Sequence, residues 1–123
     1  MNLELRSIIS PGDLANERLT LRALIDLDLG DYLVAQTGYV DESPTTALNH
    51  SVWFPFKFVQ KGDLVVIYTK TGSNSERVLD KGNKAHFFYL DLRRPIWGDA
   101  NKAALVLHAP SWASKPLNDL VKK

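Results

Sequence analysis

The chain has 123 residues, 45% of them hydrophobic, so its length fits one domain that can bury a core without disulfides or a structural metal. It contains no cysteine, which excludes disulfides, thiolate metal sites and a cysteine nucleophile. The net charge of +1 argues against a nucleic-acid binder with a large basic footprint, although residues 1–50 carry −5 and residues 51–123 carry +6.

Apolar and polar residues alternate along the first part of the chain, as they do in strands that bury one face. The alternation covers residues 3–6 and residues 19–25, and a turn at 11–13 separates them. A Gly-Asp pair then interrupts the chain before a further short strand at 32–35. The polar stretch 37–51, which contains a proline, predicts a loop.

The second half has four apolar segments that predict strands. Residues 52–59 are aromatic and β-branched, but Pro55 lacks one hydrogen-bond donor, so this segment predicts an edge or bulged strand. The strongest strand signal is 64–69, and the last two strands fall at 85–90 and 103–109. Between the strands at 64–69 and 85–90, residues 70–84 predict a long, exposed and mobile loop.

Together these segments predict an all-β fold with six to nine antiparallel strands in two packed sheets, in one domain over residues 1–115. Residues 116–123, with proline at their start and lysines at their end, predict a C-terminal tail that is helical or mobile. Phe54, Phe56 and Phe58 alternate, so they are expected to share a buried face. The expected core also includes the following apolar strand residues: Leu64, Val66, Leu105 and Leu107.

Four segments have an order and spacing that carry more information than the alternation. They are residues 11–22 with an Asn-Glu pair entering a strand, 28–34, 54–68 with a Lys-Gly-Asp turn, and 95–107 with Trp-Gly-Asp. In that order they resemble the lamin-tail domain family, which has an "NE-x-V-x-L" strand, a "DLSG"-like turn, an "F-P … L-x-x-G-x-x-V-x-I" segment and a "W-x-x-G-D-x-x-x-L" close.

The resemblance spans about residues 3–112. It implies a stand-alone bacterial or phage-type version of an immunoglobulin-like antiparallel β-sandwich, which serves as an adaptor and has no catalytic residues of its own. Residues 37–51 and 70–84 are longer than the family's pattern, which weakens the transfer of any binding surface.

The residues that most often carry chemistry do not form a known catalytic or metal motif. His50, His86 and His108 lack short metal-ligand spacing and are expected to be ordinary surface or strand histidines. Asp26, Asp28 and Asp31 favour a solvated strand end over a weak cation site. A Gly-x-Ser-x-Gly elbow is also absent from the sequence. We therefore expect no enzyme activity, no cofactor and no metal.

Exposed aromatic and arginine side chains are the remaining candidates for function, because they supply much of the energy of protein interfaces. The candidate partner-binding residues are Trp53, Arg93, Arg94 and Trp97. They favour a non-catalytic protein-interaction module that binds a protein partner or itself. The alternatives are an accessory nucleic-acid-binding domain, with Lys84 and the two arginines beside the aromatic run 87–89, and a small hydrolase.

The N-terminal sequence shows no signal peptide, and no apolar run approaches the roughly 18 residues of a membrane helix. The expected location is therefore the cytoplasm, without a membrane partner.

Overall fold

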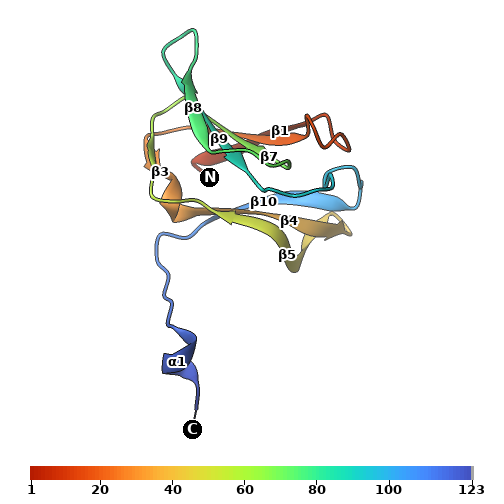
Figure 1. Cartoon of the computed structure of the whole chain (residues 1–123), viewed down its shortest axis with the longest axis vertical. Helices are drawn as coiled ribbons and strands as arrows, with labels where there is room; N and C mark the ends of the chain where they lie inside the picture. Colours follow the sequence, from red (N-terminus) through yellow and green to blue (C-terminus); the bar gives the residue numbers. More distant parts are fainter. Residues whose placement is uncertain (123) are drawn as a thin grey trace.

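The computed structural model describes residues 1–122, and the chain is mostly β with one short C-terminal helix (Figure 1). Strands hold 48% of the residues and helices 6%, so the mostly β prediction is confirmed. The elements in chain order are β1 Leu3–Ile9, β2 Arg18–Ala23, β3 Leu27–Asp28, the 3-10 turn η1 Leu29–Asp31, β4 Tyr32–Val40, β5 Ser43–Trp53, β6 Phe58–Val59, β7 Leu64–Tyr68, β8 Ser75–Val78, β9 Lys84–Tyr89, β10 Lys102–His108 and α1 Leu117–Leu120.

The strands form three sheets with the orders β1-β2-β7-β9-β8, β10-β4-β5 and β3-β6. The two larger sheets face each other, and β3 lies at one end of the space between them (Figure 1). One apolar core joins them, because β2 and β7 contribute Leu21 and Val65 while β4 and β10 contribute Val34 and Val106. Burial of these side chains against one another is the main term that holds the sheets together.

The expectation of wholly antiparallel pairing is wrong in one place. β7 and β9 pair in parallel, from Leu64 opposite Ala85 to Tyr68 opposite Tyr89. A parallel pair needs a long crossover connection, and residues 69–83 supply it. Within this connection β8 pairs antiparallel with the outer edge of β9, so the prediction of a loop over 70–84 is wrong for Ser75–Val78. All four residues of β8 are exposed, so the sequence shows no alternation there.

The predicted loop at 37–51 is also wrong, because β4 and β5 form a long antiparallel hairpin there. Its two turn residues, Asp41 and Glu42, have φ of 52° and 63°, which is the backbone that a tight type I′ hairpin turn requires. β5 is the edge strand of its sheet and almost every residue in it is exposed. An edge strand tolerates Pro44 and needs no apolar face, so its sequence reads as a loop.

Two of the three phenylalanines expected in the core are exposed. Phe54 is buried, but Phe56 is 72% exposed and Phe58 is 69% exposed. The strand ends at Trp53 and the next one begins only at Phe58, so the alternation on which the prediction depended does not continue through Pro55.

Val66 is buried as predicted, but the predicted phase of two strands is inverted. In β7 the core residues are Val65 and Ile67, and Val66 is buried on the opposite face while Leu64 is half-buried. In β10 the side chains packed on the core are Ala104 and Val106, so Leu105 is only half-buried and Leu107 is 39% exposed. Residues 64–68 and 103–107 are apolar at every position, and a shift of one residue exchanges the two faces of a strand.

The C-terminal arm, residues 110–122, leaves the end of β10 and runs away from the sheets (Figure 1). Its helix α1 has no buried residue. The predicted tail over 116–123 therefore contains a one-turn helix, and Lys123 lies outside the described residues.

Candidate interaction surfaces

Trp53 and Trp112 form a half-exposed aromatic pair where the C-terminal arm leaves the sheets. Each is 50% exposed, and their rings meet edge to face with centroids 4.6 Å apart. Trp53 stands at the end of β5, and its indole N–H donates to the carbonyl oxygen of Gly30 at 3.0 Å. This hydrogen bond holds the Trp53 ring in one orientation while half of the ring stays open to solvent.

Two cavities flank this pair. One, of 210 Å³, is lined by both tryptophans with Leu33, Ala109 and neighbouring residues of the arm. The other, of 290 Å³, is lined by both tryptophans, Gly30, Phe54, Pro55 and Phe56. We call Trp53, Pro55, Phe56 and Trp112 the aromatic patch. Its exposed rings and adjoining hollows are typical of a surface that receives apolar side chains of a partner.

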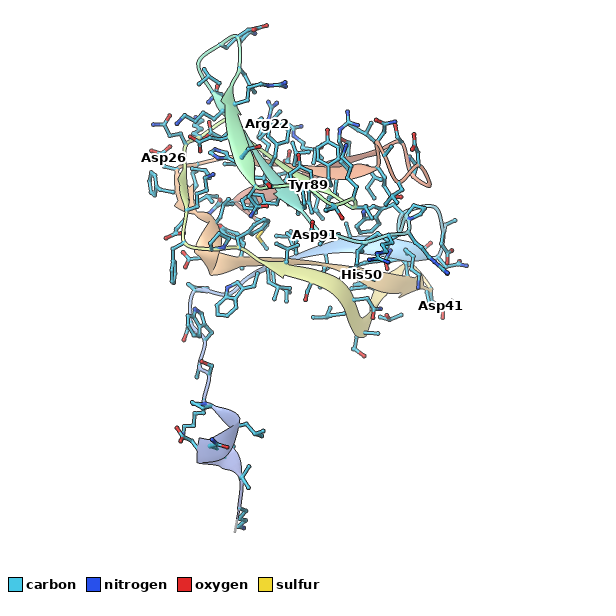
Figure 2. The ribbon with its side chains drawn as sticks, viewed as in Figure 1. Arg22, Asp26, Asp41, His50, Tyr89 and Asp91 are labelled. Carbon is cyan, nitrogen blue, oxygen red and sulfur yellow. The ribbon has the colours of Figure 1, made fainter. Side chains whose placement is uncertain are left out.

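The other predicted site residues lie apart from Trp53. Arg93 and Arg94 are exposed and line a 440 Å³ cavity with His50 and Ile96. Figure 2 shows His50 on the side of the molecule away from the root of the arm. Trp97 is partly buried and packs against the core. The structure therefore groups the arginines with each other but not with Trp53.

A buried carboxylate joins the segment around Trp97 to the first hairpin. Glu17 is fully buried, and its two carboxylate oxygens accept hydrogen bonds from the N–H groups of Gly12, Ile96 and Trp97 and from the hydroxyl of Thr69. Burial alone raises the pKa of Glu17, but these four donors outweigh it and leave the pKa below its usual value. Glu17 thus remains ionised and fastens three segments together.

A second buried carboxylate, Asp63, anchors β9 to the turn before β7. Asp63 Oδ2 lies 2.9 Å from His86 Nε2, and its carboxylate also accepts from the N–H groups of Gln60 and Lys84 and from Asn83. His86 Nδ1 lies 3.5 Å from Glu76 Oε2, and Glu76 in turn pairs with Lys57 and Lys84. Lys84, which the sequence analysis considered as a nucleic-acid contact, therefore forms an ion pair with Glu76.

Asp26 and Asp28 accept hydrogen bonds from backbone N–H groups. Asp28 Oδ1 accepts from the N–H groups of Gly30 and Lys57, and Asp26 Oδ1 accepts from that of Lys61. Over residues 1–122 no group of three His, Asp or Glu side chains is arranged to hold a metal ion. In the same span no helix has the length and apolar character to cross a membrane.

The outward face of the five-stranded sheet carries a surface of which the sequence analysis identified only the aromatic run 87–89. Tyr68 of β7 stacks on Tyr89 of β9 with centroids 5.4 Å apart, and Phe87 lies beside them. Arg18, Lys70 and Arg77 lie over these rings. The parallel pairing of β7 and β9 brings the rings together, and no local sequence pattern indicates this pairing.

Neither a scan against protein-family models nor a search of curated proteins found a match for this chain. The proposal of a function below therefore depends on the surfaces described above.

Proposed function

We propose that this chain is a non-catalytic protein-interaction module built on an immunoglobulin-like β-sandwich of the lamin-tail type. Support for the resemblance comes from the contact between its first and last segments. The Asn-Glu segment and the Trp-Gly-Asp segment meet through Glu17, which accepts from the N–H groups of Ile96 and Trp97. A Cβ added at Gly98 would lie 3.4 Å from the Cα of Gly12, so the two loops also touch.

A non-catalytic role is supported by how the buried acidic groups are used. Glu17 and Asp63 each accept four hydrogen bonds, and five of the eight donors are backbone N–H groups. Carboxylates occupied in this way hold loops in place and have little capacity left to exchange protons with a substrate.

The aromatic patch is the binding site of the proposed module, and the half-exposed Trp53–Trp112 pair is the observation that carries the proposal. Tryptophan is among the residues most enriched at energetically dominant interface positions. Trp53 is already fixed by its hydrogen bond to Gly30, so binding costs little further ordering of that side chain.

The C-terminal arm supplies the segment that fits this patch. Its apolar side chains are exposed: Leu117 75%, Leu120 63% and Val121 54%. Leu117 and Leu120 are three residues apart and so lie on one face of α1. A helix this short is not stable in water by itself, because nucleation is costly and the helix has few hydrogen bonds to offset it. Docking on an apolar surface would stabilise it.

The partner is then a second copy of the chain. The arm runs away from the sheets, so α1 does not reach the patch of its own molecule (Figure 1). Two copies can exchange arms so that each α1 packs on the other copy's patch, which gives a closed, symmetric dimer. Arg93 and Arg94 remain candidates for a separate contact, because they are exposed and form no ion pair within residues 1–122.

Mixing two disabled variants tests this proposal. Leu117→Asp/Leu120→Asp removes the arm's apolar face, and Phe56→Ala/Trp112→Ala removes the patch, so each variant alone should be monomeric. A mixture should form a heterodimer in size-exclusion chromatography with light scattering, because one intact arm meets one intact patch. Arg93→Ala/Arg94→Ala is the control and should dimerise like the unaltered chain. Dimers of either disabled variant alone would overturn the arm and patch as the interface.

A further inference from the structure

The outward face of the five-stranded sheet arranges its side chains in rows that the strand registers define. Core residues such as Leu19 and Leu21 point inward, so Arg18, Thr20 and Arg22 of β2 point outward. Arg18 pairs with Tyr68, and Tyr68 pairs with Tyr89, which forms one row. The second row runs through Thr20, Val66, Phe87 and Ser75, and the third through Arg22, Leu64, Ala85 and Arg77.

Cations occupy both ends of this face and aromatic rings occupy its middle. The Lys70 ammonium lies 4.8 Å and the Arg18 guanidinium 5.6 Å from the centre of the Tyr68 ring. The Arg77 guanidinium lies 5.7 Å from the centre of the Phe87 ring. Arg18 and Arg22 are four residues apart on β2, which places them about 13 Å apart along the strand.

These cations are free to meet an anion. Within residues 1–122, Arg18, Arg22, Lys70 and Arg77 form no ion pair with a carboxylate. Arg22 Nε is buried and has no hydrogen-bond acceptor among the residues that the structure describes. Arg22 and Arg77 line the same 690 Å³ cavity, together with Lys81 and Asp80. The one carboxylate that the register places beside Arg22, that of Glu4, is paired with Arg6.

We propose that this outward face binds single-stranded nucleic acid, with Arg18, Arg22, Lys70 and Arg77 on the phosphates and the rings of Tyr68 and Phe87 on the bases. Tyr68 and Phe87 are partly exposed. A cation over such a ring is a weak contact, whereas a base stacked on a ring is a stronger one. A bound base can therefore replace the cation on the ring, and the displaced cation then pairs with a neighbouring phosphate. Figure 2 labels Arg22 and Tyr89, which mark two of the rows.

The rings favour nucleic acid over an acidic peptide. The face of an aromatic ring carries negative charge density, so a carboxylate gains nothing by approaching it. A nucleobase stacks on the same face regardless of sequence. Four of the 15 lysines and arginines lie on or beside this face, so it can hold a short strand although the net charge of the chain is only +1.

Fluorescence anisotropy with a labelled oligothymidylate of about 12 nucleotides tests the phosphate contacts. Four phosphate contacts predict a slope of about −2.8 for the logarithm of the association constant against the logarithm of salt concentration. Arg22→Ala/Arg77→Ala should weaken binding at least tenfold and reduce the slope to about −1.4, since two contacts are lost. The control, Arg93→Ala/Arg94→Ala, removes the same charge elsewhere and should leave the association constant within about twofold and the slope at about −2.8.

An abasic oligonucleotide of equal length tests the stacking. It keeps every phosphate but offers no base, so the proposal predicts binding at least tenfold weaker than that of oligothymidylate. Equal binding of the abasic strand, or equal competition by polyglutamate at the same charge concentration, would show a general anion surface and overturn the proposal. The dimer interface is tested separately, because Phe56→Ala/Trp112→Ala should not change oligonucleotide binding.

Discussion

Asp63 and His86 form a buried side-chain hydrogen bond, with Asp63 Oδ2 2.9 Å from His86 Nε2 and both side chains at least 97% shielded from solvent. Asp63 lies in the turn before β7 and His86 lies in β9, so their contact joins these two strands. The parallel pairing of β7 and β9 builds the outward face of the five-stranded sheet. Burial raises the pKa of Asp63, but hydrogen bonds from His86, Lys84, Gln60 and Asn83 lower it by more. The resulting pKa is about 2, below the ordinary value of 3.8.

This lowered pKa predicts that acid destabilises the fold. The carboxyl has a pKa of 3.8 without these contacts, so its contribution is fully present above about pH 4 and is lost as the pH falls towards 2. The difference corresponds to about 2 kcal/mol. Urea unfolding across this range should show the loss, and Asp63→Asn should show less of it. An Asp63→Asn curve with the full acid dependence would contradict the assignment.

Replacing Glu17 should be costly even when the shape is kept. In Glu17→Gln one carboxylate oxygen becomes an NH₂ group; at the Oε2 position it can donate to the Thr69 hydroxyl but faces the Ile96 N–H, so at least one hydrogen bond is lost together with the negative charge. The expected destabilisation is about 2–4 kcal/mol, because the abandoned groups are buried. Equilibrium urea denaturation measures it. A change within about 0.5 kcal/mol would show that the loops do not depend on Glu17.

Leu21 and Leu107 form a matched pair that tests the corrected strand phases. Leu21 is fully buried and Leu107 is 39% exposed. Leu21→Ala should cost about 2–5 kcal/mol, as buried leucines do. Leu107→Ala should cost less than about 1 kcal/mol, since the side chain faces outward. Thermal and urea unfolding of both variants give the comparison. A reversed order would restore the inward phase that the sequence suggested for Leu107.

The sequence predicted this fold where one face of a strand is apolar and the other is polar. β2 is the clearest case, because Leu19, Leu21 and Ala23 alternate with polar residues and are buried. Prediction was wrong for β5 and β8, whose residues are nearly all exposed at sheet edges. It also inverted β7 and β10, in which neighbouring residues are all apolar and alternation carries no phase.

The candidate surfaces depended on contacts between distant segments, so the sequence identified only part of them. Trp53 was predicted from its place opposite the phenylalanines, and the structure leaves it half-exposed. Its partner Trp112 lies 59 residues further along the chain and was not selected. The rings of Tyr68 and Tyr89 meet only because a crossover of residues 69–83 lets β7 and β9 pair in parallel.

Gly72 offers a test of the outward face that leaves its charges intact. A Cβ at this position would overlap the Tyr89 ring, so Gly72→Ala should displace that ring from its stack on Tyr68. We expect oligothymidylate binding to weaken several-fold, while stability changes by less than about 1 kcal/mol because Gly72 is exposed. Anisotropy titration and thermal unfolding of the same preparation measure both. Unchanged binding would show that the Tyr89 ring does not contribute.

Sedimentation equilibrium over a wide range of chain concentrations tests the proposed function most directly. The arm exchange predicts that the apparent mass rises from the 13.8 kDa of one chain to that of a dimer as the concentration increases. It also predicts that Leu117→Asp/Leu120→Asp keeps the mass at 13.8 kDa throughout. A mass of one chain at every concentration for the unaltered protein would contradict a second copy as the partner of the Trp53–Trp112 patch.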